Sequence, residues 1–369
     1  MDERAGRFAA QRLDGRPHDG GVPGLVRHLL AVQAQDPAAF PLALRARAAG
    51  ITASDLTEAR AAQTVVRCWG PRGTLHLIAA EDLAWLYPLV SPAPAGSVRR
   101  LRQLGVEAGP DKVVAAVDAA LSGQGPLTKE RLGQRLAEQG LPVTGQGIVH
   151  AAMLAAGRGL VVLGPEYGGK PSYVHAADWL GAPLPTEAAG REAAVGMLVA
   201  RYQAAHHPCD PADLAAWSGL PLGEVRRAWA ATRGYRSAPL PVRLIPAFDE
   251  YLLGWRDRDH AVPAAFRRQA HPGGGIIRSA VLVDGLVTGT WRMRRTAGRV
   301  DITVEPFVPL PGEVLPGEAL SGEALPGEVP PGEALSGEAL PGEVLPGLAA
   351  EAAAIGSFLG LPARISAAS

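Results

Sequence analysis

The sequence predicts a helix-rich α+β protein made of three tandem winged-helix units, followed by a C-terminal β-rich segment. The first observation is a run of amphipathic helical stretches that leads into a β-hairpin, which is the pattern of a winged helix. The second is the recurrence of that order further along the chain. The third is size and composition: 369 residues, 47% hydrophobic and 20% charged, indicate a globular protein with more than one domain-sized unit.

Residues 1–95 form the first predicted unit. Pro37 should end its second helix, directly after the Gln33-Ala34-Gln35 stretch, because the residue before a proline is pushed out of the helical region. Thr52 or Ser54 can cap a later helix. The expected helices lie at about 3–13, 23–36, 38–48 and 54–62, and the expected hairpin strands at 64–69 and 74–78.

The second and third units, residues 96–184 and 185–262, repeat this order without repeating the sequence. In the second unit, glycines and a proline separate two apolar strands, so a hairpin is expected there as well. The third unit ends with the apolar stretch 242–245 and a connecting segment. The helices of the two units are expected at 111–122, 127–139 and 145–157, and at 187–205, 210–217 and 221–232.

The C-terminal part is predicted in three pieces. Residues 263–310 are a β-rich hairpin segment, whose Asp284-Gly285 pair is a hairpin turn. Residues 311–345 are seven tandem pentapeptides of the type Pro-Gly-Glu-Val/Ala-Leu, and we expect a disordered acidic insert because recurrent Pro and Gly prevent regular structure. Residues 346–369 hold a last helix.

Charge and targeting features narrow the class of protein. The formal net charge is zero, but the repeat alone carries seven glutamates, so the rest of the chain has a net charge of +7. This charge suits nucleic-acid binding but also follows from an arginine-rich composition. No apolar run is long enough to cross a membrane, no signal peptide is evident, and two distant cysteines give no disulfide framework. We expect a cytoplasmic protein that does not bind membranes.

Candidate site residues follow from residue type and spacing. Gln33 and Gln35 are two long amides close to a proline in an apolar setting, and they need hydrogen-bond partners if buried. Taken alone they are more readily explained as structural amides at a helix end that bond to the backbone. The first hairpin carries a polar set that fits either an ordinary solvated hairpin or one that touches DNA: Arg67, Trp69, Arg72, Thr74 and His76. Arg45 and Arg47, on a predicted helix, are either solvated or face DNA.

Other motifs point to no further chemistry. The sequence has no phosphate-binding Gly-rich loop, no nucleophile elbow and no zinc-type spacing of His and Cys. Gly273-Gly274-Gly275 is more simply a loop than a phosphate site, and His206-His207 a helix end. We therefore expect neither a metal nor a cofactor.

Five segments in order resemble one family, the winged-helix DNA glycosylases of the AlkZ/YcaQ type, over nearly the whole chain. The segments are Leu29–Pro37, Arg67–His76, Ala215–Leu220, Arg243–Gly254 and Val281–Gly285. The sequence departs from the family pattern at Ala34, which is smaller than the usual central residue of the Gln-apolar-Gln motif, and at the pentapeptide repeat.

The resemblance implies a C-shaped arrangement of winged helices that clasps double-stranded DNA. It also implies that Gln33 and Gln35 are catalytic in a monofunctional DNA N-glycosylase. The substrates would be N7-alkylated purines and interstrand crosslinks, in DNA repair or in self-resistance to alkylating antibiotics. On this interpretation basic residues contact phosphates, among them Arg45, Arg47, Arg67, Arg72, Arg256 and Arg292, and the protein acts as a monomer.

Two alternatives remain at the level of sequence. One is a non-catalytic winged-helix DNA-binding protein, for instance a transcriptional regulator. The other is a scaffold that uses the acidic repeat to bind a partner.

Overall fold

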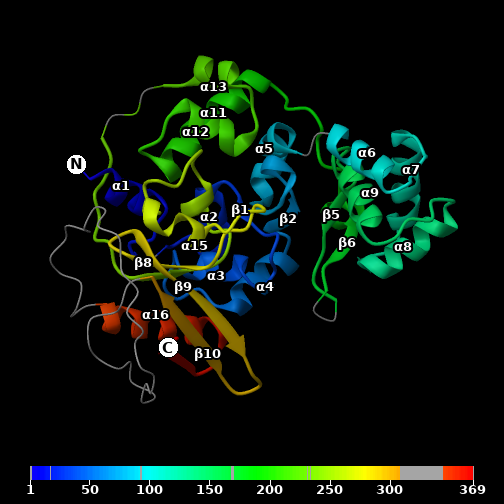
Figure 1. Ribbon diagram of the computed structural model, residues 1–369. Coiled ribbons are helices and arrows are strands. Elements are labelled where there is room, and N and C mark those ends of the chain that lie inside the picture. The colour runs from blue at the N-terminus through cyan, green and yellow to red at the C-terminus, as the bar shows by residue number, and fades with distance from the viewer. Residues whose placement is uncertain are drawn as a thin grey trace.

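The computed structural model describes residues 2–16, 18–91, 94–167, 170–230, 232, 234–307 and 344–368. The chain folds as a helix-rich α+β protein with two sheets, as the sequence predicts (Figure 1). One sheet has six strands in the order β1-β3-β2-β5-β6-β4, and the other has five in the order β11-β10-β9-β8-β7. No helix in the described ranges is long and apolar enough to cross a membrane.

The first unit has four helices and the expected hairpin. Thr52 caps α4 through a capping box with Asp55, as the Thr-x-x-Asp spacing favours. The hairpin of β2 and β3, hereafter the first wing, closes through a short turn at Pro71–Gly73. The elements are α1 (Glu3–Ala10), α2 (Gly21–Leu29), α3 (Phe40–Arg45), α4 (Ala53–Ala61), β2 (Val65–Trp69) and β3 (Leu75–Ala79).

The segment that holds the two glutamines is not a helix end, and this prediction was wrong. Helix α2 ends at Leu29, and Leu30 has a φ of +69°, which turns the chain away from the helical path. The next residues form strand β1 (Val32–Gln33), which pairs antiparallel with β3 in the register Gln33↔His76. Gln33 therefore extends from the edge strand of the six-stranded sheet.

The second unit is joined to the first through the sheet. Its hairpin of β5 and β6, hereafter the second wing, pairs antiparallel with β2 at Arg67↔Leu163, so both wings belong to one sheet. In Figure 1 this unit lies to one side of the rest of the molecule. Its elements, with the connecting helices, are α5 (Leu83–Val90), α6 (Pro94–Gln103), α7 (Pro110–Leu121), β4 (Leu127–Thr128), α8 (Lys129–Glu138), α9 (Gln146–Ala156), β5 (Val161–Leu163), β6 (Ser172–His175) and α10 (Ala176–Leu180).

The third unit has its three helices, α11 (Arg191–His206), α12 (Pro211–Ser218) and α13 (Leu222–Ala228). The next strand, β7 (Arg243–Ile245), pairs with β8 of the five-stranded sheet instead of forming a wing for these helices. A third complete winged helix is therefore not confirmed. Two short helices, α14 (Glu250–Leu253) and α15 (Arg267–Ala270), follow β7.

The five-stranded sheet contains the expected hairpin, with Asp284 and Gly285 both at positive φ in its turn. The sequence analysis did not predict strand β11. This strand pairs parallel with β10, although the two are far apart in the sequence. The strands are β8 (Ala280–Val283), β9 (Leu286–Arg295), β10 (Val300–Pro306) and β11 (Ala363–Ala367), and the last helix is α16 (Val344–Leu359). The acidic insert was predicted to be disordered. Its residues 311–343 lie outside the described ranges.

One apolar core binds the first unit to this sheet. Leu29 of α2, Leu44 of α3, Leu244 of β7, Ile302 of β10 and Ile355 of α16 are all essentially inaccessible to solvent and belong to one contact cluster. Burying each such side chain contributes about 1.5–3 kcal/mol. The N-terminal helices and the C-terminal sheet therefore fold as one body, despite the distance between them in the sequence.

Arg45 and Arg47 lie inside this body, which corrects the expectation that they face DNA. Arg45 donates to Glu351 Oε2 (2.7 Å) and to the carbonyl of Leu244 (2.6 Å). Arg47 makes a two-pronged contact with Asp249, at 2.6 and 2.8 Å, and both side chains are fully buried. Neither guanidinium can reach a phosphate, because each is enclosed and already bonded.

Asp249→Asn is expected to lower the free energy of unfolding by about 3–5 kcal/mol, because it leaves the Arg47 charge buried without a counter-charge. Urea unfolding followed by circular dichroism measures this. The control is Asp301→Asn, which removes a partner of Arg299 in an ion pair at the surface and should cost at most about 1 kcal/mol. Equal small effects of the two substitutions would contradict the role assigned to Asp249.

Candidate active site

The Gln33-Ala34-Gln35 backbone is held from both sides. The Ala34 N–H donates to the carbonyl of Leu75 (2.7 Å), and the Ala34 carbonyl accepts from Arg67 Nε (2.9 Å). Arg67 Nη2 also lies 3.5 Å from the carbonyl of Gln35. Both polar backbone groups of Ala34 are thus bonded, which fixes the backbone between the two glutamines.

Arg67 is therefore a support of this strand and not a DNA contact, which corrects the sequence-based expectation. Its side chain is 1% exposed, and burial lowers the pKa of its guanidinium to about 10. Arg67 also forms an ion pair with Glu166, which belongs to the segment between β5 and β6.

The backbone of Gln33 is hydrogen-bonded, whereas its side-chain oxygen has no hydrogen-bond partner among the described residues. Its N–H donates to Glu250 Oε1 (2.9 Å), at the start of α14. The Gln33 side-chain oxygen Oε1 is buried, yet it has no hydrogen-bond partner in the described part of the chain. A buried amide oxygen without a partner is costly, and at an active site it is a place for a water or a ligand.

Gln35 differs from Gln33. It is exposed, and its Oε1 accepts a hydrogen bond from the N–H of Leu75 (3.1 Å). One of its two functional ends is thus committed to the β3 backbone. Gln33 ends strand β1 and Gln35 follows it by two residues. Among the described residues, the side-chain oxygen of Gln33 has no hydrogen-bond partner, whereas that of Gln35 has one.

Gln33 lines a pocket of about 280 Å³. This volume is slightly below the roughly 300–1,000 Å³ of small-molecule sites, so a large adduct would not fit wholly inside it. Two arginines and one histidine share the wall with apolar and glycine residues: Arg72, Phe248, Leu253, Arg258, His271, Gly273, Gly275, Ile276 and Ile277.

The arginines give the pocket a positive wall. Arg72 is exposed, and its Nη1 donates to the carbonyl of Trp217 (2.8 Å). Burial lowers the pKa of Arg258, and the positive charge of Arg72 lowers it further, because the two guanidinium groups repel each other. Paired cations at an accessible pocket are suited to phosphate oxygens.

Glu250 lies behind Gln33 and was not singled out from the sequence. It is 1% exposed, and burial raises the pKa of its carboxyl, an effect that the nearby Arg72 and the Gln33 N–H oppose. Trp217 Nε1 lies 3.4 Å from the second carboxyl oxygen. The signal for Glu250 in the sequence is the Asp249-Glu250 pair between apolar residues, at the start of a short helix.

Arg258 and His271 were also missed. Burial is the main cause that lowers the pKa of His271, to about 4, with Arg258 and Arg267 acting in the same direction, so the imidazole is neutral at physiological pH. The loop after it contains Gly273, Gly274 and Gly275, all at positive φ, and leads to the half-exposed Ile276. Gly273 and Gly275 of this loop, which the sequence analysis interpreted as a plain loop, line the pocket.

The other predicted DNA contacts divide into buried and exposed residues. Trp69 and His76 are buried, which corrects the expectation for both; Trp69 stacks on Tyr173 with ring centres 6.3 Å apart. The hydroxyl of Thr74 donates to the Pro71 carbonyl (3.2 Å). Arg256 and Arg292 are exposed, Arg256 among Asp210, Asp213 and Asp257 and Arg292 beside Glu305.

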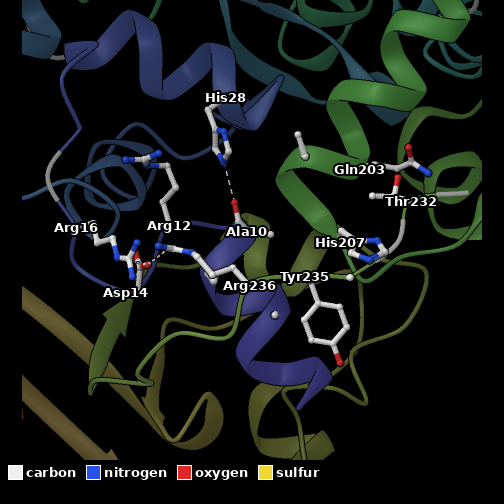
Figure 2. A pocket seen from close by; sticks show the side chains of 14 residues that line it. Ala10, Arg12, Asp14, Arg16, His28, Gln203, His207, Thr232, Tyr235 and Arg236 are labelled. Carbon is white, nitrogen blue, oxygen red and sulfur yellow. Dashed lines mark hydrogen bonds and ion pairs between the residues drawn. The ribbon is translucent and has the colours of Figure 1, made fainter. Parts of the chain in front are cut away.

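A larger pocket of about 510 Å³ lies elsewhere, between α1, the end of α2, the end of α11 and residues 232–236. Figure 2 shows Asp14 between Arg16 and Arg236, and His28 directed at the carbonyl of Ala10. Its basic side chains are thus partly neutralised by Asp14, and neither Gln33 nor Gln35 lines it. Size alone does not make it the better candidate.

Comparisons with known proteins agree with the resemblance seen in the sequence. The family model for AlkZ-like DNA glycosylases matches residues 26–236 and 234–358. An interstrand DNA cross-link repair glycosylase of Streptomyces sahachiroi is 27% identical over 339 residues, which cover 78% of this chain and 86% of that protein. The structure of Streptomyces sahachiroi DNA glycosylase AlkZ has the same fold, with a TM-score of 0.70 and 22% identity over 99% of this chain and 98% of the other.

His76→Gln is expected to change the pH dependence of stability. Burial, helped by Arg72, lowers the pKa of His76 from 6.5 to about 3. Between these values the unfolded state binds a proton that the folded state does not, so His76 loses its stabilising effect as the pH falls. The stability advantage of the wild type over the variant should shrink by about 1.4 kcal/mol per pH unit below pH 6. Urea unfolding at pH 7, 6 and 5 measures this, and a constant difference would contradict it.

Proposed function

The chain belongs to the AlkZ-like DNA glycosylase family, and from this premise we propose that it hydrolyses the N-glycosidic bond of cationic N7-alkylated purines in DNA. The observation that carries the proposal is the Oε1 of Gln33, which is buried, has no partner within the described residues and lines an arginine-walled pocket. An amide oxygen in that position is an acceptor for one water molecule.

Neutral amides suffice for this reaction because the leaving base is already positively charged. A water oxygen forms the new bond to C1′ while the bond between C1′ and N9 breaks. The electron pair of that bond moves into the purine ring and cancels its charge, so no acid has to protonate the base. The attacking water releases a proton to solvent. Positioning of the water then becomes the main task of the protein, and positioning can contribute several kcal/mol.

Within this mechanism Gln33 holds the water and Gln35 plays a second part. The Gln35 oxygen is used by the Leu75 N–H, which leaves its amide N–H₂ to donate to the sugar or phosphate of the lesion. Gln33 should therefore affect the chemical step most, and Gln35 should affect both this step and the alignment of the DNA.

Other groups near the pocket are less suited to act as the base or nucleophile. Glu250 is enclosed behind the strand and engaged by the Gln33 N–H. The Asp36 carboxylate accepts from the N–H of Ala38 (2.8 Å), as a turn-forming residue does. No lysine lines this pocket among the described residues, which supports a monofunctional reaction that uses water and forms no Schiff base.

In this proposal Arg72 and Arg258 contact the phosphates next to the lesion, which is supported by their sharing a pocket with Gln33. Arg256 and Arg292 remain proposed contacts further along the duplex, since both are exposed. The small volume of the pocket is compatible with an adduct that stays largely outside it. This supports bulky adducts and interstrand crosslinks as substrates, in line with the name of the Streptomyces sahachiroi relative.

The remaining parts of the proposal follow from the same family. We propose a monomer that clasps duplex DNA in a C-shaped arrangement, in the cytoplasm, in general alkylation repair or in self-resistance to an alkylating antibiotic.

Gln33→Ala is expected to slow release of 7-methylguanine by about 100-fold or more, because the water loses its acceptor. Gln35→Ala should slow release to a smaller extent. The measurement is single-turnover formation of abasic sites in a duplex with one 7-methylguanine, together with DNA affinity. Gln139→Ala, at an exposed glutamine at the end of α8, is the control and should behave as the wild type. DNA binding without base release by the wild type would instead favour a non-catalytic DNA-binding protein.

A further inference from the structure

An ionic contact connects the second wing to the strand that carries the two glutamines. Glu166, between β5 and β6, accepts from Arg60 Nη1 through Oε2 (2.5 Å) and lies 3.4 Å from Arg67 Nη1 through Oε1. Arg60 also donates to the carbonyl of Gly164 (2.9 Å). One carboxylate of the second unit thus bridges two arginines of the first.

We propose that Glu166 is a positioning residue, which holds Gln33-Ala34-Gln35 in its reactive geometry through Arg67. This inference rests on the proposed glycosylase function. Glu166 contacts Arg67, and Arg67 donates to the carbonyls of Ala34 and Gln35. Ala34 lies between the two proposed catalytic glutamines, and Gln35 is one of them. Glu166 itself does not line the pocket of Gln33.

The charges explain why Arg67 depends on Glu166. The guanidinium of Arg67 is almost fully buried, and that of Arg60 is 13% exposed. Both lie over the ring of Phe40, at 5.5 and 6.0 Å from its centre. Glu166 is the carboxylate that these two cations share. Without it, two like charges would face each other in a poorly solvated place, and Arg67 would be driven away from the Ala34 carbonyl.

Removal of Glu166 is expected to slow base release, an effect that the loss of a negative charge alone does not predict. Glu166 is acidic, so its removal from a DNA-binding protein should leave DNA affinity unchanged or increase it. A positioning role predicts the opposite for the chemistry: slower base release at unchanged or tighter binding. A rate that falls without a loss of affinity therefore separates positioning from a general effect of charge.

The experiment compares Glu166→Gln with Glu130→Gln in the full-length protein. Glu130, on α8, forms an ion pair at 3.5 Å with Lys170, which like Glu166 lies between β5 and β6. Substitution of Glu130 therefore removes the same charge from the same region without affecting the contacts of Arg67. The readouts are the single-turnover rate of 7-methylguanine release at saturating enzyme, DNA affinity, and the midpoint of thermal unfolding. Glu166→Gln should be about tenfold slower or more at equal affinity, and Glu130→Gln should match the wild type.

Two further variants keep the inference falsifiable if Glu166→Gln is unstable. Glu166→Asp retains the charge and should recover part of the rate. Arg60→Gln combined with Glu166→Gln removes the like-charge repulsion and should release base faster than Glu166→Gln alone. A wild-type rate in Glu166→Gln, or equal losses in all three variants, would overturn the positioning role while leaving the proposed function intact. A wild-type protein that releases no 7-methylguanine would overturn the proposed function, and the inference with it.

Discussion

The buried ion pair between Arg47 and Asp249 is the interaction on which the site depends. Asp249 caps α14 by accepting the N–H of Tyr251, and its carboxylate is held by Arg47, two residues after the end of α3. This arrangement places the next residue, Glu250, under the N–H of Gln33. Arg47 also donates to Gln11, whose amide donates to the carbonyl of Ala205 near the end of α11. A single buried cation therefore ties together α3, α14, the segment after α1 and α11.

Arginine has two roles in this protein that composition cannot distinguish. Arg45, Arg47 and Arg67 are buried and hold backbone carbonyls and carboxylates, a use that suits a planar group with five donors. Arg72 and Arg258 have the same chemistry but line a pocket. The difference is set by the tertiary structure, because exposure depends on which helix or sheet covers a position. A charge count therefore overstates the basic surface available to DNA.

The sequence was informative where local chemistry decides the structure. A cap at Thr52 or Ser54, both wings and the Asp284-Gly285 turn follow from short-range signals, and the structure has both wings, the turn and the cap at Thr52. It was uninformative where distant segments decide. The apolar run before Gln33 suits a helix as well as a strand, and only pairing with β3 selects the strand. Likewise β7 joins β8, and β11 joins β10, across long stretches of chain. Gln33 and Gln35 were found by their motif, whereas Glu250 and Arg258 required the fold.

In the proposed reaction two uncharged amides suffice because the leaving base carries the positive charge. The most direct test of this mechanism compares two duplexes that differ only at the lesion, one with 7-methylguanine and one with 7-methyl-7-deazaguanine, which has the same shape but no positive charge. A mechanism that depends on a cationic leaving group predicts base release from the first duplex and none from the second, at similar affinity for both. Release of both bases at comparable rates would contradict it, because a neutral purine leaves only with the help of an acid.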